Sequence, residues 1–351
     1  MIILGDLYPF KLSLLLANPI IINMKKRFVF LWAIWTFVGA ALIYGASISD
    51  SKNSIATVIA NVLSLSPLVG LLFALGSSKA SREFNDWLQK DKNSLFYVAG
   101  GLTLLFILPG LVTGTFNPYY SVIFAAVVFA VFGALRQTAN QEFSLTWTDL
   151  ALWILLWIPF DLRWYMELLP ATRDTYTWWS IVISIIGVVG WIGYRRADIG
   201  FNLVPRLKDI GIALLALVFI MVLVVPPGLL TGFLSFHVPQ SFNFPKLTLH
   251  FVGLFLTVAL PEELFFRGIL LRGLDKMFSK KWIPLVISSL AFGLMHWNNA
   301  STLSTQITYV CLAAFAGLGY GWAYRKSGNN LFAAILVHTL VDWTWKLFLA
   351  G

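Results

Sequence analysis

Residues 248–271 read TLHFVGLFLTVALPEELFFRGILL, an apolar stretch that carries two adjacent carboxylates and an arginine. A helix needs about 20 largely apolar residues to cross the hydrocarbon core of a bilayer, so its length predicts a membrane-spanning helix. An ionised side chain at the centre of such a helix costs about 2.5–3.5 kcal/mol when it faces lipid. We therefore expect Glu262, Glu263 and Arg267 to face one another, water or an ion.

The composition of the whole chain supports a membrane protein. Of its 351 residues, 58% are hydrophobic and 12% are charged, whereas soluble domains carry about 25% charged residues. This balance excludes a soluble enzyme and a disordered chain. The net charge of +9 is spread between apolar runs rather than gathered in one patch, which excludes a nucleic-acid-binding module and predicts no nucleic-acid partner. The single cysteine, Cys311, excludes a disulfide framework.

Ten further stretches of the chain are also predominantly apolar. They are residues 28–47, 55–77, 95–115, 121–136, 148–160, 178–194, 211–235, 283–300, 306–324 and 331–350. We expect an all-α polytopic membrane protein with about ten or eleven membrane segments, with the lipid bilayer as its surroundings. The two shortest runs are 121–136 and 148–160. For these two, a tilted, re-entrant or interfacial helix is an alternative to a full span.

Basic residues predict the orientation of these segments. If every run crosses the membrane, nineteen of the 25 Lys and Arg residues fall in loops on one side and five on the other. Loops rich in Lys and Arg stay on the cytoplasmic side. The loops 78–94, 195–209 and 272–282 are therefore expected in the cytoplasm. Glu262 and His338 are then expected within reach of a cytoplasmic tail in the inner leaflet.

The distribution of polar residues divides the chain near residue 200. Residues 1–23 hold only short apolar pieces, and we expect them to be a non-native extension ahead of a start at Met24. Residues 24–200 hold their charges in loops and form an N-terminal transmembrane region with no assigned role. Residues 201–351 form the expected core, because the apolar runs from residue 248 onward themselves contain acids, histidines and an arginine.

The first polar cluster, around Glu262 and Glu263, divides into two sides of one helix. Glu263 and Arg267 are four residues apart and share a face, so a structural ion pair is expected. Glu262 lies about 100° around the helix and is free to point elsewhere. Pro261 fits the start of a new helical stretch, because it lacks the N–H that such a first turn leaves unpaired.

Two histidine clusters follow on later apolar runs. His338 and Asp342 are four residues apart and can address one point. His296 follows Phe292 on another run and must meet the other polar groups by tertiary packing. A lone membrane histidine also serves as a hydrogen-bonding contact between helices. The glycine-rich stretch 317–321 lies within an apolar run, where close helix packing explains it.

Together these clusters resemble the CPBP family, also called the Abi or type II CAAX endopeptidase family of intramembrane proteases. Its motifs Glu-Glu-x-x-x-Arg, Phe-x-x-x-His and His-x-x-x-Asn/Asp occur in order, within about residues 245–350. The resemblance implies hydrolysis of a peptide bond near the C-terminus or membrane edge of a membrane-associated protein or peptide, prenylated in the eukaryotic branch. It also implies a multi-pass protein of a bacterial plasma membrane.

The resemblance implies roles for four residues. Glu262 is the expected base that takes a proton from water, and His296 helps to hold that water. His338 and Asp342 would hold an oxyanion or a metal ion. Asp342 stands where the family also has Asn, and an ionised Asp cannot donate a hydrogen bond. This favours zinc or another divalent metal held by Glu262, His296, His338 and Asp342, with a metal-free glutamate base as the alternative.

Two other functions remain open from the residues alone. Buried Glu, His and Asp also build proton relays, so a proton-coupled transporter is one alternative. That interpretation predicts inverted repeats, and the polar residues instead cluster in one part of the chain. A family member without proteolytic activity, acting as a bacteriocin immunity protein or a scaffold, is the other.

Overall fold

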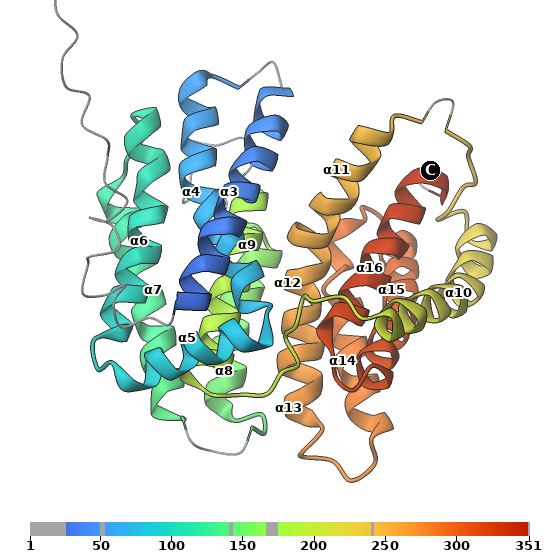
Figure 1. Ribbon diagram of the computed structural model, residues 1–351. Helices are drawn as coiled ribbons and strands as arrows, with labels where there is room; N and C mark the ends of the chain where they lie inside the picture. The colour runs from blue at the N-terminus through green and yellow to red at the C-terminus, as the bar shows by residue number, and fades with distance from the viewer. Residues whose placement is uncertain (1–25, 50–52, 140–142, 166–174, 240–241, 350–351) are drawn as a thin grey trace, which may run out of the picture.

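The fold is helical throughout the residues that the structure, a computed structural model, describes. These are residues 26–49, 53–139, 143–165, 175–239 and 242–349, and none of them lies in a β-strand. The expected extension 1–23 and the start at Met24 lie outside this range. The helices form two groups side by side, α3 to α9 and α10 to α16 (Figure 1). The all-α class predicted from the apolar runs is confirmed.

Nine helical segments in the described residues are long and apolar enough to cross a membrane. Eight of them are α3 (Lys26–Ser49), α4 (Ile55–Leu75), α6 (Ser94–Thr113), α7 (Pro118–Gln137), α9 with η2 (Thr175–Gly187 and Val188–Tyr194), α10 (Leu207–Leu230), α15 (Leu303–Lys326) and α16 with η6 (Leu331–Thr344 and Trp345–Leu349). The ninth runs from Phe244 to Leu274. The chain is an integral multi-pass membrane protein.

The two remaining apolar runs form shorter helices. Run 148–160 is α8 (Trp147–Asp161), and run 283–300 contains α14 (Trp282–Leu294). They have 15 and 13 residues, which span about 20 Å each at 1.5 Å per residue. All eleven apolar runs are therefore helical, and nine of them reach a length that spans the bilayer.

The ninth segment carries the paired glutamates and does not break at Pro261. It passes without interruption through α11 (Phe244–Leu254), η3 (Phe255–Ala259), α12 (Leu260–Glu263), η4 (Leu264–Leu271) and α13 (Arg272–Leu274). Pro261 lies in the first turn of α12, so the expected start of a helical stretch is found there, without an interruption of the segment. The π-helical stretches η3 and η4 on either side of Pro261 widen the helix locally, and such stretches are a common way to accommodate an irregularity without ending a helix. The Trp153 indole in α8 donates to the carbonyl of Phe265 in η4, at 3.0 Å.

The basic loops meet at one end of the bundle, which we call the basic end. Backbone and side-chain hydrogen bonds join loops distant in sequence: Gln89 to Gly193, Leu203 to Gly76, Arg272 to Asp198 and Arg325 to Lys281. Gly200 has a φ of +71°, and a Cβ there would lie 1.7 Å from the carbonyl oxygen of Asn329. A glycine is required at this crossing. The loops 78–94, 195–209 and 272–282, predicted on one side, thus lie together.

A buried carboxylate fixes α10 at the basic end. Asp209 is fully buried and accepts hydrogen bonds from Arg206, at 2.6 Å, and from the amide of Asn330, at 2.7 Å. The hydrogen bond that Arg206 donates to Asp209 raises the pKa of the Arg206 guanidinium. Because Asn330 immediately precedes α16, this contact sets the relative height of α10 and α16.

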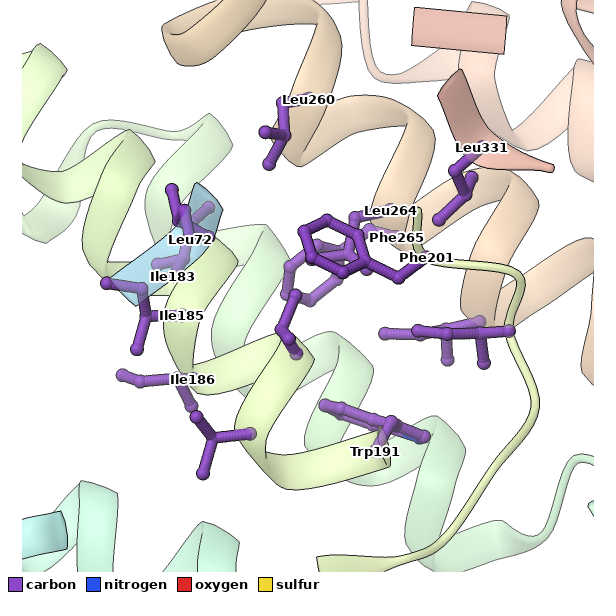
Figure 2. Close-up of a cluster of buried hydrophobic side chains, with 14 of the residues drawn as sticks. Leu72, Ile183, Ile185, Ile186, Trp191, Phe201, Leu260, Leu264, Phe265 and Leu331 are labelled. Carbon is purple, nitrogen blue, oxygen red and sulfur yellow. The ribbon is translucent and has the colours of Figure 1, made fainter. Parts of the chain in front are cut away.

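The two groups of helices pack through a buried apolar interface (Figure 2). Its side chains come from α4, from α9 with η2, from the loop before α10 and from the helix that carries the glutamates. Labelled members are Leu72, Ile183, Ile185, Ile186, Trp191, Phe201, Leu260, Leu264, Phe265 and Leu331, all at most 8% exposed. The interface holds the glutamate-bearing helix between the N-terminal helices and α16.

Candidate active site

The imidazole of His338 lies at the centre of the polar cluster. Its Nδ1 is 2.7 Å from Oε1 of Glu263. Its Nε2 faces two further carboxylates, Oδ2 of Asp342 at 3.5 Å and Oε2 of Glu262 at 3.7 Å. Since an ionised carboxylate only accepts hydrogen bonds, Nδ1 carries a proton when it bonds Glu263. The other nitrogen, Nε2, is therefore aimed at the two remaining carboxylates.

Glu263 binds two partners at once. Its Oε1 also accepts a hydrogen bond from Nη1 of Arg267, at 2.8 Å, and both side chains are fully buried. The second guanidinium nitrogen donates to the carbonyl of Gly317 on α15, at 3.1 Å. A Cβ on Gly317 would lie 3.0 Å from that nitrogen, so glycine leaves room for the guanidinium. Sequence spacing predicted the ion pair and did not reveal the contact between Glu263 and His338.

Aromatic rings surround this ion pair. The Arg267 guanidinium lies 4.4 Å from the ring centroid of Phe292 and 5.2 Å from that of Tyr320. The Tyr320 ring is stacked on the His338 imidazole, with centroids 4.4 Å apart and an interplanar angle of 13°. A cation over an aromatic face is stabilised, most strongly when water is excluded. Tyr320 was not predicted as a site residue, although it lies in the glycine-rich stretch 317–321.

His296 reaches the same site from the loop that follows α14. Its Nδ1 is 2.9 Å from the carbonyl oxygen of Phe292. A carbonyl only accepts, so Nδ1 carries the proton, and Nε2 of the neutral ring is an acceptor. The His296 ring also contacts the ring of Tyr309 on α15, with centroids 5.0 Å apart. His296 lines the same cavity as His338 and Asp342, so the tertiary packing expected for it brings it close to the third motif.

Glu262 keeps a partly exposed side chain, at 14%. Besides His338, it interacts electrostatically with Asp161 at the end of α8 and with Tyr176 at the start of α9. Both belong to the N-terminal region, to which the sequence assigned no role. Asp161 directly follows the apolar run 148–160, and this position is the sequence signal that could have pointed to it.

A cavity of about 70 Å³ adjoins the cluster, enough for ordered water. His296, His338 and Asp342 supply its titratable groups. The rest of its wall is almost entirely apolar: Met221, Val224, Val225, Phe233, Leu234, Phe292, Tyr309, Leu312, Ala313, Ala316, Tyr320, Val341, Trp345 and Leu349. Water in this cavity would contact hydrogen-bonding groups of His296 from the second motif and of His338 and Asp342 from the third.

The geometry of the cluster bears on the metal ion expected from the sequence. Among the described residues, no three His, Cys, Asp or Glu side chains are already close enough together to hold one. Nδ1 of His338 bonds Glu263 and Nδ1 of His296 bonds a backbone carbonyl, which leaves Nε2 of each ring as the nitrogen that could bind a metal ion. The metal expected from Asp342 therefore stays a prediction.

Fold and site define a polytopic membrane protein with a buried carboxylate–histidine centre beside a water-sized cavity. Residues 244–344 match the family described as Type II CAAX prenyl endopeptidase Rce1-like. This match supports the resemblance to the CPBP family over these residues. Comparisons with curated proteins and with solved structures found no match.

We predict that Glu263→Gln destabilises the protein, whereas Glu262→Gln leaves its stability near that of the wild type. The first change leaves the buried Arg267 charge without its carboxylate, and breaking a buried pair costs about 3–5 kcal/mol. Glu262 has no such partner among the described arginines and lysines. Thermal unfolding of the purified variants in detergent measures the difference. A combined Glu263→Gln and Arg267→Met variant should recover part of the loss, and equal unfolding temperatures for the two single variants would contradict the assignment.

Proposed function

We propose that this protein is an intramembrane endopeptidase that hydrolyses a peptide bond of a membrane-associated protein or peptide. The observation that carries the proposal is the placement of His338, with one nitrogen held by Glu263 and the other aimed at Glu262 and Asp342 beside a cavity. The match of residues 244–344 to the Type II CAAX prenyl endopeptidase family supports it at the level of the reaction class. The three motifs supply a base, a polarising group and a water-holding acceptor.

In the proposed reaction Glu262 acts as the general base. Water held by the Nε2 acceptor of His296 attacks the carbonyl carbon of the scissile bond while Glu262 takes its proton. The same proton then passes to the leaving nitrogen as the C–N bond breaks. Glu262 suits this role because its Oε2 accepts no hydrogen bond from the described residues, whereas Oε1 of Glu263 bonds both Arg267 and His338.

His338 stabilises the oxyanion in this proposal. Glu263 fixes the ring through Nδ1, so the N–H at Nε2 of the imidazolium form points to where negative charge develops on the carbonyl oxygen. This follows the general principle that preorganised donors stabilise such a charge. Tyr320 keeps the ring in plane by stacking, and Arg267 balances the charge of Glu263. No step requires a metal ion.

The regions of the chain divide the work. We propose that residues 201–351 form the catalytic core and that residues 24–200 support it, with Asp161 and Tyr176 beside Glu262. The plasma membrane of a bacterium is the proposed location, and a prenyl group on the substrate is optional. The buried ion pair of Glu263 and Arg267 has a structural role in this proposal. It does not take part in proton transfer, as a proton relay of a transporter would.

The experiment that tests the function compares membrane proteins exposed to wild type or to Glu262→Gln. Each purified full-length protein is reconstituted in liposomes together with detergent-extracted membrane proteins of the expression host. Mass spectrometry of newly formed peptide termini should find products that require the wild type and are lost with Glu262→Gln. Identical sets of termini for the two proteins would contradict proteolysis and favour the immunity, scaffold or transport alternatives.

Asp342 distinguishes an oxyanion site from a metal site. Asp342→Asn should keep or raise the proteolytic rate, because Asn supplies an N–H donor to the oxyanion; a single such donor is worth about 2.7–4 kcal/mol. A chelator should leave the wild-type rate unchanged. Loss of activity in both experiments would instead assign Asp342 to a metal site and overturn the metal-free mechanism while leaving proteolysis standing.

A further inference from the structure

We infer that the site receives its substrate from the end of the bundle opposite the basic loops, as an apolar, extended segment of a membrane protein that reaches His338 and Asp342 between α10 and α16. We call this opposite end the outer end. The inference rests on the proposed function for the identity of the ligand as a substrate. It differs from the sequence-based expectation of access from a cytoplasmic tail.

The path from the cluster to the basic end is filled with side chains. Helical rise places His338 about 10 Å from Leu331, where α16 begins at the basic end. The residues between the cluster and this end are fully buried on all three core helices: Phe266, Ile269 and Leu271 on η4, Ala323 and Tyr324 on α15, and Leu331, Ala333, Ala334, Ile335 and Val337 on α16. Tyr324 also donates to the carbonyl of Ile199, at 3.0 Å. Although His338 lies only about 10 Å from the basic end, the buried side chains between them leave no opening in that direction.

The cavity extends in the opposite direction. Its wall includes Phe233 and Leu234, which follow the outer end of α10, and Trp345 and Leu349 near the outer end of α16. Backbone hydrogen bonds from Ser235 to Leu349 and from His237 to Phe348, at 3.2 and 2.9 Å, join these two ends, so entry of a substrate here requires α10 and α16 to separate. Exposure follows the same direction: the Asp342 side chain is 21% exposed, whereas that of His338 is 3% exposed.

The wall chemistry indicates what the cavity accepts. Apart from its two histidines and Asp342, it is formed by aliphatic and aromatic side chains, so the residues of the substrate next to the scissile bond are expected to be apolar. A peptide needs more room than the cavity of about 70 Å³ offers. The wall that can yield is α10, since only 17% of its span is buried and its far face exposes Leu215, Val218 and Val222.

Thiol labelling of the full-length protein in sealed membrane vesicles tests the direction of access. In a Cys311→Ala background, Ala316→Cys places a thiol in the cavity wall one turn from Tyr320, and Lys280→Cys places one in the exposed basic loop 272–282 as the reference. Vesicles of both orientations are treated with a membrane-impermeant sulfonated methanethiosulfonate. Ala313→Cys, one turn nearer the outer end, replaces Ala316→Cys if that variant fails to fold.

We expect the cavity thiol to be modified only in vesicles whose outer end faces the medium, and the reference thiol only in those of opposite orientation. Modification of the cavity thiol from the basic side, or from neither side, would overturn the inference. Labelling requires no hydrolysis, so failure of the proposed proteolysis leaves this result unchanged. Conversely, if the protein cleaves its substrate and the cavity thiol reacts from the basic side, the proposed function stands and only the inferred direction of access is wrong.

Discussion

The buried charge of Arg267 is the constraint on which the C-terminal half of the protein depends. A guanidinium that is fully buried among membrane helices is tolerated only with a carboxylate, hydrogen-bond acceptors and aromatic faces around it. Glu263, the carbonyl of Gly317 and the rings of Phe292 and Tyr320 provide these from three different helices. Neutralising one charge thereby fixes the positions of η4, α14 and α15.

The same contacts orient the reactive groups. Glu263 accepts from both Arg267 and His338, so the ion pair that stabilises the fold also sets the direction of the imidazole. Glu262, one residue earlier, is turned away from Arg267 and remains available for chemistry. Adjacent glutamates in a helix thus serve different purposes because they face different neighbours about 100° apart.

Most of the architecture follows from the sequence, because apolar length and the bias of basic residues are properties of single segments. All eleven apolar runs form helices, and the basic loops meet at one end. The spacing of Glu263 and Arg267 predicted their pair. Contacts between segments could not be predicted in this way: the Glu263–His338 hydrogen bond and the Tyr320 stack depend on how α15 and α16 pack. Pro261 lies in the first turn of a helical stretch, as its chemistry predicts, and the π-helical stretches on both sides keep the segment continuous.

Nitrogen-15 NMR of histidine-labelled protein in detergent tests the central claim most directly, that Glu263 holds the Nδ1 proton of His338. The chain has four histidines, and a His338→Gln variant identifies the signal of interest. The account predicts a protonated, hydrogen-bonded Nδ1 at His338 whose shift changes in Glu263→Gln and persists in Glu262→Gln. An unprotonated Nδ1, or a signal indifferent to the loss of Glu263, would contradict it.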